Sequence, residues 1–553
     1  MSQPLKAIVH KTVAVLGASY GGARTAHLLA QQLPADWRVV LIDRNSHMNH
    51  LYVLPRFAVL PVHAHKAFVP YSNLFHEAST PDKDYSRHLI LNAQVTSLGE
   101  HSLTLNCSFP EHGIVDGQLN FDFAVYALGS HLPAPINLWG PVGDEEEIKE
   151  YSKPEEVSVP QTKAEDVSPS FPATSLDEPA PVVAASTVEK AIITAETDAA
   201  VLPSTLPQLA KEAEEKEALT SSPSEPVKDD KLVSQAPAVV PVAVNLPGTK
   251  PAAIDWLKRF SKRVEKVSSV LVVGGGALGI QYAADIAEVY PNKTVSLLHS
   301  RHRLLPRFDE SMHDEILSTL SSLDVNLILG ERLDFGFTGK TVINEQGVPE
   351  RVVRTQSGRE IRAELVMLCT GQTPNTDIMK SFLPDSIIPD GPSKHQIRVT
   401  RTLQVGVPIP ASATPASSTT SPKSVGSQDD DEEEEEDPQY TVPHPHIFAI
   451  GDAADAFGAI NAGHTAYLQG EVAARNILKM VQFREEGKEY PVEELERYKP
   501  GPPAIKVSLG LSKACYQYSG MVGKKTDVAE DLDAYAMWQA MHIETDEQGM
   551  LTL

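Results

Sequence analysis

The chain has 553 residues, with 73 acidic and 48 basic side chains and a formal net charge of −25. At roughly 100 to 200 residues per domain, this length allows about two to four domains. A charge this negative argues against nucleic-acid binding, which needs a clustered basic face. The cysteines, Cys107, Cys369 and Cys515, are widely spaced, which excludes a disulfide framework and a CxxC pair. The histidines lack the spacing of metal ligands, so we predict no metal site.

Membrane and targeting signals are not evident in this sequence. No apolar run reaches the roughly 18 residues that cross a bilayer, and the N-terminus, MSQPLKAIVH, has neither a signal-peptide core nor a glycine at position 2. We therefore expect a cytoplasmic protein without a transmembrane segment. Peripheral membrane contact and association with mitochondria or lipid droplets stay open.

Two acidic tracts interrupt the chain. Residues 143–247 are rich in Glu, Pro, Ser, Ala and Thr and keep no helix or strand period, and residues 408–440 include nine consecutive acids at 429–437. Such segments cannot bury enough apolar surface to offset the entropy of ordering them, so we predict two disordered insertions. Residues 141–240 carry a charge of −13 and the acidic run carries −9, which leaves the rest nearly neutral. The tracts are either solvated loops or docking segments for a basic partner.

The first ordered block begins with a nucleotide-binding pattern. The apolar strand TVAVLG is followed by GASYGG, a helix, and a second strand, RVVLID, that ends in Asp43. Gly17 permits a tight turn, Ser19 lets the backbone approach a pyrophosphate at the helix N-terminus, and Gly22 allows close helix packing. A carboxylate at the end of the second strand can accept both ribose hydroxyls. The predicted dinucleotide contacts are Gly17, Ala18, Ser19, Tyr20, Gly21, Gly22 and Asp43.

The same pattern recurs in the next block, as the strand SVLVVGGG, a helix and the strand TVSLLH. Gly274, Gly276 and Gly279 give an intact GxGxxG turn. Two dinucleotide sites in one chain indicate electron transfer between two cofactors. The acid expected after the second strand is replaced by HSR, which ends in Arg301. An arginine could pair with a 2'-phosphate and so permits NADPH, although Arg301 could equally be a solvated surface residue.

Three further motifs make the pattern specific. They are AVYALGS with Gly129, LVMLCTGQTPN with Gly371, and FAIGDAAD with Gly451 and Asp452. Together with the two turns, they resemble the pyridine nucleotide-disulfide oxidoreductase superfamily of flavoproteins. The resemblance implies an α/β fold with two Rossmann-like domains. It assigns the first turn, Asp43 and Asp452 to FAD, and the second turn and Gly371 to NADH or NADPH.

One branch of that superfamily resembles the chain more closely. The stretches RFAVLPVHAHKAFVPY, VLVVGGGALGIQYAADIAEVYPNKTVSLLHS and KVSLGLSKACYQYSGMVG are similar to the apoptosis-inducing-factor-like branch, which includes the ferroptosis suppressor proteins. In that branch, residues matching Arg56 and Val95 contact FAD. The chain departs from the branch in its two acidic insertions and in Ser2, which stands in place of a myristoylated glycine.

The resemblance also implies a domain plan. The C-terminal part ends in a helix-like segment, AEDLDAYAMWQAMHI, whose apolar residues we expect to pack in a core or an interface. The plan is a first part of the FAD domain at 1–142, a disordered insertion at 143–247, an NAD(P)H-binding domain at 248–375, a second part of the FAD domain at 376–480 and a C-terminal cap domain at 481–553.

The cysteine positions bear on the reaction. Disulfide reductases of the superfamily carry a CxxxxC pair just after the first unit, where this chain reads NSHMNHLYVLPRFAV. We therefore predict that the chain does not reduce disulfides. Cys107 and Cys369 lie in strand-like patterns, and we expect both to be buried small residues.

The stretch GHTAYLQG, residues 463–470, partly matches the A-Q-x-A-x-Q-x-G quinone motif of type II NADH dehydrogenases. We predict that His464 lies near the flavin and stabilises its reduced form or gives a proton to a quinone; alternatively, it is a helix-start residue bonded to the backbone. Lys66 is predicted to face the flavin ring. The expected protein is an FAD-dependent NAD(P)H oxidoreductase that reduces a quinone or a similar small acceptor. The alternative is a flavin-based redox-sensing or cell-death signalling protein with slow turnover.

Overall fold

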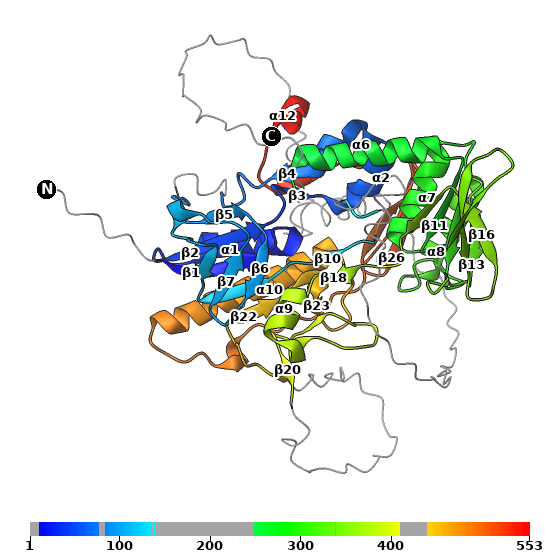
Figure 1. Cartoon of the computed structure of the whole chain (residues 1–553). Coiled ribbons are helices and arrows are strands. Elements are labelled where there is room, and N and C mark those ends of the chain that lie inside the picture. The colour runs from blue at the N-terminus through cyan, green and yellow to red at the C-terminus, as the bar shows by residue number, and fades with distance from the viewer. Residues whose placement is uncertain (1–9, 77–82, 134–135, 139–247, 338, 410–439) are drawn as a thin grey trace, which may run out of the picture.

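The computed structural model describes residues 10–76, 83–133, 136–138, 248–337, 339–409 and 440–553 (Figure 1). The predicted insertion at 143–247 lies outside these residues, and so does most of the insertion at 408–440. The two ends of the second tract are joined, because β20 (Val407–Pro408) pairs antiparallel with β21 (Tyr440–Thr441). The chain therefore leaves and re-enters the fold at one place, where a long connection disturbs the rest of the structure little.

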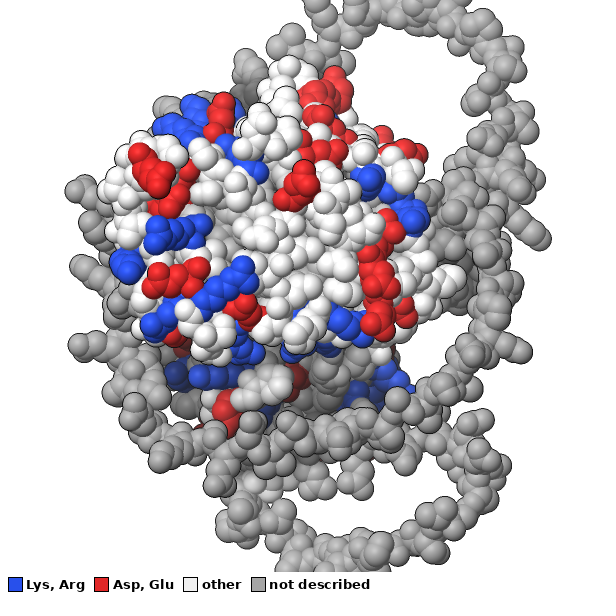
Figure 2. Space-filling view, turned by 90° about the vertical axis from the view of Figure 1, so that its right-hand side faces the viewer, with Lys and Arg blue, Asp and Glu red and all other residues white. Residues whose placement is uncertain are grey.

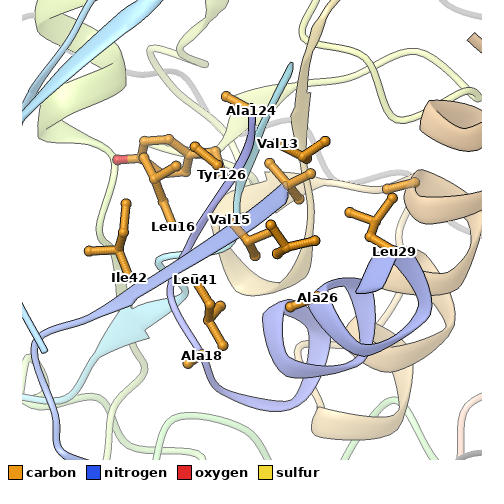
Figure 3. Packing of buried hydrophobic residues seen from close by; sticks show 14 of the residues in the cluster. Val13, Val15, Leu16, Ala18, Ala26, Leu29, Leu41, Ile42, Ala124 and Tyr126 are labelled. Carbon is orange, nitrogen blue, oxygen red and sulfur yellow. The ribbon is translucent and has the colours of Figure 1, made fainter. Parts of the chain in front are cut away.

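The first Gly-rich turn lies in a five-stranded parallel sheet with the order β22-β9-β1-β2-β5. The strands are β1 (Lys11–Leu16), β2 (Trp37–Asp43), β5 (Leu89–Asn92), β9 (Phe123–Tyr126) and β22 (Ile447–Ala449). Helices α1 (Tyr20–Gln32) and α10 (Gly463–Glu485) pack against each other beside it. Figure 3 shows Val13 and Val15 of β1 on the side of Ala26 and Leu29 of α1, while Leu16 lies on the other face of the sheet near Ile42 and Tyr126. Both faces of the strands are buried, which explains their continuous apolar sequence.

The second turn lies in a four-stranded parallel sheet with the order β13-β12-β11-β17. Helix α6 begins after Thr249, whose side chain accepts a hydrogen bond from the Ala252 backbone, and it buries Trp256 and Phe260. The strand, glycine turn, helix and strand that the sequence predicts for the second nucleotide-binding unit are confirmed. The elements are α6 (Lys250–Lys266), β11 (Ser269–Val273), α7 (Ala277–Val289), β12 (Thr294–His299), α8 (Glu310–Ser322), β13 (Asn326–Leu329) and β17 (Leu365–Leu368).

Smaller antiparallel sheets and short helices complete the described fold. The sheets are β6-β7-β8 (Val95–Leu98, Ser102–Leu105, Gln118–Asn120), β14-β15-β16 (Lys340–Ile343, Pro349–Arg354, Glu360–Ala363), β24-β25-β26 (Ile505–Ser508, Ala514–Tyr518, Met521–Lys525) and β3-β4 (His47–Asn49, Phe68–Pro70). Two further two-stranded pairs are β10-β18 (Ser130–His131, Thr373–Pro374) and β19-β23 (Ile397–Arg398, Ala454–Asp455). The short α-helices are α2 (Leu54–Val59), α9 (Asp377–Phe382), α11 (Tyr535–Ala540) and α12 (Glu547–Thr552). The 3-10 helices are η1 (Leu51–Val53), η2 (Pro61–Ala67), η3 (Pro110–His112), η4 (Pro384–Ser386), η5 (Gly451–Ala453) and η6 (Val492–Glu494).

The C-terminal helix-like segment is shorter than its pattern predicts. Leu532 and Asp533 both have φ of 57°, a left-handed conformation that a helix cannot contain, so α11 begins only at Tyr535. Met537 and Trp538 are buried, as expected for core packing. The indole N–H of Trp538 donates to the Lys66 carbonyl at 2.9 Å, which ties this segment to the first block.

The fold class is therefore α/β, with two sheets of the Rossmann type. Figure 2 shows the face at the right of Figure 1, where charged residues of both signs are interspersed around an uncharged central area. The described residues of that face do not form the continuous basic field that nucleic acid requires. No helix in the described ranges is long and apolar enough to cross a membrane.

One buried ion pair joins α2, α7 and the C-terminal part. The Arg56 Nε, on α2, donates to Asp285 Oδ2, on α7, at 3.0 Å, and both side chains are 0% exposed. The same guanidinium donates to the carbonyls of Gly510 and Glu530. Burial raises the pKa of Asp285 to about 6, and Arg56 counteracts that rise. The Arg56 guanidinium thus donates its hydrogen bonds to acceptors within the protein. These contacts do not support the predicted contact of Arg56 with FAD, which stays a prediction.

We expect Arg56→Met to lower the free energy of unfolding by about 3 to 5 kcal/mol, because it leaves the Asp285 carboxylate buried without its partner. The double variant Arg56→Met/Asp285→Leu should recover part of that loss. The matched control is Arg259→Met, which removes an exposed ion pair to Asp255 on α6 and should cost about 0.5 kcal/mol. Urea unfolding measures all three; equal losses for Arg56→Met and Arg259→Met would contradict the role of the buried pair.

Candidate functional site

The first Gly-rich turn has the geometry of a phosphate-binding turn. Gly17 has φ of 98°, and a Cβ added there would lie 2.3 Å from the Ala127 carbonyl oxygen. A Cβ on Gly22 would lie 1.8 Å from the Gly17 carbonyl oxygen. Ser19 occupies the N-cap position of α1, but its side chain makes no capping hydrogen bond. The turn is therefore closed by glycine contacts, and the Ser19 hydroxyl is not used to cap the helix.

Asp43 lies at the end of β2, beside this turn. Its Oδ2 accepts from the Ala18 N–H at 2.6 Å, and its Oδ1 accepts from the Asn45 N–H at 2.7 Å. Burial raises the pKa of Asp43, while these two N–H groups oppose that rise. Carboxylate oxygens keep further lone pairs for ribose hydroxyls. Asn45, which the sequence reading missed, has a buried Oδ1 without a hydrogen-bond partner among the described residues, so it offers a second acceptor there.

Val95 begins β6 and is buried close to the Asp43 strand end. The Ala93 N–H, two residues earlier, donates to the Asp43 carbonyl at 2.9 Å. The predicted FAD contact of Val95 is compatible with this position and stays a prediction.

Tyr20 and Gly21 join the turn to α10. A Cβ on Gly21 would lie 2.7 Å from the Ala466 carbonyl oxygen, and one on Gly470 would lie 2.5 Å from the Gly21 carbonyl oxygen. Gly21 is thus needed for close contact between α1 and α10, a reason that the motif alone does not give. The Tyr20 ring packs on Gly463, and its hydroxyl accepts from the Leu51 N–H at 3.1 Å.

The loops after β9, β17 and β22 meet at one junction. Strand β10 pairs with β18, so Gly129 and Gly371 lie on adjoining segments, and a Cβ on either would meet no described atom within 4 Å. The Ser130 hydroxyl donates to Asp452 Oδ2 at 2.8 Å and also contacts the Gln372 side chain. Burial raises the pKa of Asp452. Ser130 was not predicted as a site residue from the sequence, although it directly follows the predicted Gly129.

A small cavity lies beside Asp452, at the N-terminus of α10. Apart from Gly451, Asp452, Asn461, Thr465 and Gln469, its walls are apolar: Ala454, Ala456, Ala459, Ile460, Ala462 and Ala466. The backbone N–H of Gly451 donates to Gln469 Oε1 at 2.7 Å, which fixes the turn that carries Asp452. The cavity has a volume of about 10 Å³, which is room for one water molecule, so it marks polar groups around Asp452 and does not itself hold a ring.

His464 is the second residue of α10, adjacent in sequence to residues that line this cavity. Burial lowers the pKa of His464, so its imidazole is neutral near pH 7. It is not among the residues lining the cavity, and its catalytic role stays a prediction.

The Lys66 side chain forms ion pairs with carboxylates of the C-terminal segment. Its Nζ lies 2.8 Å from Asp531 Oδ2 and 3.0 Å from Glu547 Oε2, and its side chain is 10% exposed. Burial alone would lower the pKa of Lys66, but the hydrogen bonds to these carboxylates raise it overall. The structure shows Lys66 as a link between η2 and the C-terminal segment, and no contact supports the predicted flavin role.

The second Gly-rich turn repeats the geometry of the first. Gly274 has φ of 126°, and its Cβ would lie 2.1 Å from the Cys369 carbonyl oxygen. A Cβ on Gly279 would lie 1.9 Å from the Gly274 carbonyl oxygen. A Cβ on Gly276, at the N-cap of α7, would meet no described atom within 4 Å. The backbone at Gly276 is thus open to a ligand, as a pyrophosphate site requires. Arg301 is exposed beyond β12.

The burial of the cysteines agrees only partly with the prediction. Cys369 and Cys515 are buried, and burial raises the pKa of both thiols. Cys107 is exposed, which corrects the prediction that it is buried: β7 ends at Leu105, and Cys107 lies in the bend that follows. All three are free, so none is paired as a redox disulfide.

The middle and last glycines of the second turn lead to opposite expectations. Gly276→Ala should fold normally, because its Cβ meets no protein atom, but should weaken NAD(P)H binding by roughly tenfold, or about 1.4 kcal/mol, by narrowing the approach to the pyrophosphate. Gly279→Ala should instead lower the thermal stability, because its Cβ would overlap the backbone. Calorimetric titration and thermal unfolding measure the two effects. Unchanged affinity in Gly276→Ala would remove this turn from the nucleotide site.

Comparison with known proteins agrees with this geometry. The family model described as "Pyridine nucleotide-disulphide oxidoreductase" matches residues 210–408. "Fe-regulated protein 8" of Mycosarcoma maydis is 33% identical over 98% of this chain and 98% of its own length. "Ferroptosis suppressor protein 1" of Homo sapiens is 27% identical over 54% of this chain and 68% of its own length. "FAD-dependent oxidoreductase FVFD30" of Flammulina velutipes is 23% identical over 43% of this chain and 59% of its own length.

These matches, with two phosphate-binding turns, account for FAD and NAD(P)H as the cofactors. The chain belongs to the pyridine nucleotide-disulphide oxidoreductase family, as an FAD-dependent oxidoreductase of the apoptosis-inducing-factor-like branch.

Proposed function

We propose that this oxidoreductase passes electrons from NAD(P)H through FAD to a quinone or a similar small, flat acceptor. The observation that carries the proposal is that the chain has two glycine turns of phosphate-binding geometry, while its three cysteines are all unpaired. Two such turns would bind two dinucleotides, and without a cysteine pair a small acceptor would take electrons directly from the flavin. The partial quinone motif at 463–470 begins α10, which forms one wall of the cavity.

The residues of the first site would hold FAD by its two ends. The turn from Gly17 to Gly22 would receive the pyrophosphate, Asp43 the adenine ribose, and Asp452 the ribityl end. When bound, FAD supplies the two-electron chemistry, and the protein supplies orientation and electrostatics. Ser130 holds the Asp452 carboxylate and so positions it toward that end of the site.

The cysteines disfavour a thiol-based reaction. Disulfide reduction needs a thiolate pair next to the flavin, and thiolates form readily only where the thiol pKa is lowered. Cys369 packs under the second turn and Cys515 lies within β25, both with raised pKa values, and neither has a second cysteine beside it in sequence. A quinone accepts electrons from reduced flavin directly and requires no cysteine.

The purified protein should be yellow and should oxidise NADH or NADPH with a soluble quinone at a rate well above that of air oxidation of its flavin. The variant Cys107→Ala/Cys369→Ala/Cys515→Ala should keep that rate, because no thiol takes part. Steady-state assays with the quinone, with a coenzyme A disulfide and with an aromatic disulfide make the comparison. Faster turnover with a disulfide, lost in the triple variant, would overturn the proposal. Turnover no faster than spontaneous flavin oxidation would favour the sensing alternative.

A separate test addresses His464. We expect His464→Ala to slow quinone turnover by roughly 10²-fold, the usual contribution of a positioned acid or base, without slowing flavin reduction by NAD(P)H. Because burial lowers its pKa, the pH profile of quinone turnover should lose an apparent pKa below 6.5 in this variant. Stopped-flow absorbance separates the two half-reactions. The matched control is His112→Ala, which changes a half-buried histidine that pairs only with Glu111 and should change neither rate.

A further inference from the structure

A strained loop lies beside Asp452, between β23 and α10. This wall loop, residues 456–462, supplies five of the residues that line the small cavity at Asp452. Phe457 has φ of 58°, a left-handed conformation that is rare for a bulky residue, and Gly458 follows with φ of 72°. A backbone of this kind persists only where surrounding contacts determine it. Contacts from other segments must therefore hold the wall loop in this conformation.

The Phe457 side chain is held by Arg401. The guanidinium carbon lies 4.1 Å from the centroid of the Phe457 ring, within the range of a cation–π contact. The Tyr498 N–H donates to the Arg401 carbonyl at 2.7 Å, which fixes the segment that carries the guanidinium. Phe457 also packs against the apolar cluster that contains the first sheet. The ring thus anchors the wall loop to the first nucleotide-binding unit.

One hydrogen bond joins the wall loop to the second nucleotide-binding unit. The Arg307 Nη2 donates to the Gly458 carbonyl at 2.5 Å. Arg307 belongs to residues 300–309, between β12 and α8, and the Leu305 N–H of this segment donates to the carbonyl of Gly275 in the second turn at 3.2 Å. Leu305 has φ of 46° and is buried, so its segment is also held in a strained conformation. Two strained loops thus meet through the Arg307 side chain.

The wall loop is continuous with the turn that carries Asp452. The Gln396 side chain donates to the carbonyls of Asp452 and Ala454, both at 3.2 Å, which braces the backbone that leads into the loop. A shift of Gly458 relative to the second unit would therefore change the walls around the Asp452 carboxylate. The hydrogen bond from Arg307 opposes such a shift.

We propose that Arg307 and Phe457 are positioning residues that hold the wall loop against both units, so that a nucleotide bound to the second turn slows the release of FAD from the first. The proposal rests on the assignment of Asp452 to the ribityl end of FAD, as part of the proposed function, and it does not depend on the electron acceptor. A nucleotide on the second turn would restrict the backbone at Gly275, and with it Leu305 and the segment that carries Arg307. Because linked binding is reciprocal, bound FAD would tighten the nucleotide by the same factor.

Release of FAD from the full-length, FAD-loaded protein tests this link, because flavin fluorescence follows it without catalysis. The rate is measured alone and with saturating NAD⁺ or NADP⁺, neither of which can reduce the flavin. We expect the nucleotide to slow release about fivefold, at the lower end of measured couplings between sites, because the Arg307 contact is exposed. Arg307→Ala should release FAD at one rate with and without nucleotide, and Arg307→Lys should keep part of the effect.

Phe457→Gly tests the other contact of the wall loop. Glycine accommodates the left-handed backbone, so this variant should fold, but it lacks the ring that Arg401 contacts. It should release FAD faster than the parent protein even without nucleotide, and an unchanged rate would contradict its positioning role. The matched control is Arg362→Ala, an exposed arginine on β16, which should keep both the release rate and the nucleotide effect.

A release rate that nucleotide does not change in the parent protein, or slows equally in Arg307→Ala, would overturn the proposal. Loss of the effect in Arg362→Ala would do so too, since it would show only general charge attraction. Calorimetric titration checks that each variant still binds the nucleotide, so that a lost effect is not a lost ligand. A protein that shows the effect but reduces no quinone would refute the proposed acceptor and keep this link, whereas quinone turnover without the effect would refute the link alone.

Discussion

A fully buried ion pair, between Arg56 and Asp285, ties α2, α7 and the C-terminal part together. It reaches from a short helix of the first block to the helix that follows the second nucleotide turn, and its guanidinium also binds carbonyls of the C-terminal part. The surrounding segment packs in the same apolar cluster as α6 and α7. Two buried charges cost desolvation energy that only close pairing offsets, so their geometry tolerates little movement. The proposed electron transfer between two cofactors would need such constancy, because transfer depends on alignment of the reacting atoms.

Within this frame, the molecule uses one local design twice. Both turns close by the same pair of backbone contacts, at Gly17 and Gly22 in one unit and at Gly274 and Gly279 in the other. The difference lies in the side chain that accepts the next N–H, a carboxylate in the first unit and an imidazole in the second. The backbone of the turn is thus kept while the side chain at the strand end changes.

The motifs that could be located from the sequence are those in which one short segment fixes its own geometry. A glycine turn needs a positive φ and close backbone approach, and only glycine meets both, so the turn residues and Asp43 could be identified before the fold was known. Arg56 and Lys66 could not be assigned in that way. Each is a cation in a segment near the first site, but its partners lie more than 200 residues away, at Asp285 and at Asp531. Cys107 was wrongly predicted to be buried, because its strand pattern continues past Leu105, where the structure has a bend.

The sequence by itself determined the α/β class, the two phosphate-binding turns and the lack of a cysteine pair, since each depends on residue type at fixed spacing. Tertiary structure decided which side chains share a site. It brought Ser130 to Asp452, joined Gly21 to Gly470, and gave the cations Arg56 and Lys66 their carboxylate partners. The physical reason is that backbone conformation in a turn is a local property. The partner of a buried charge or a close-packed glycine depends instead on how distant segments fold together.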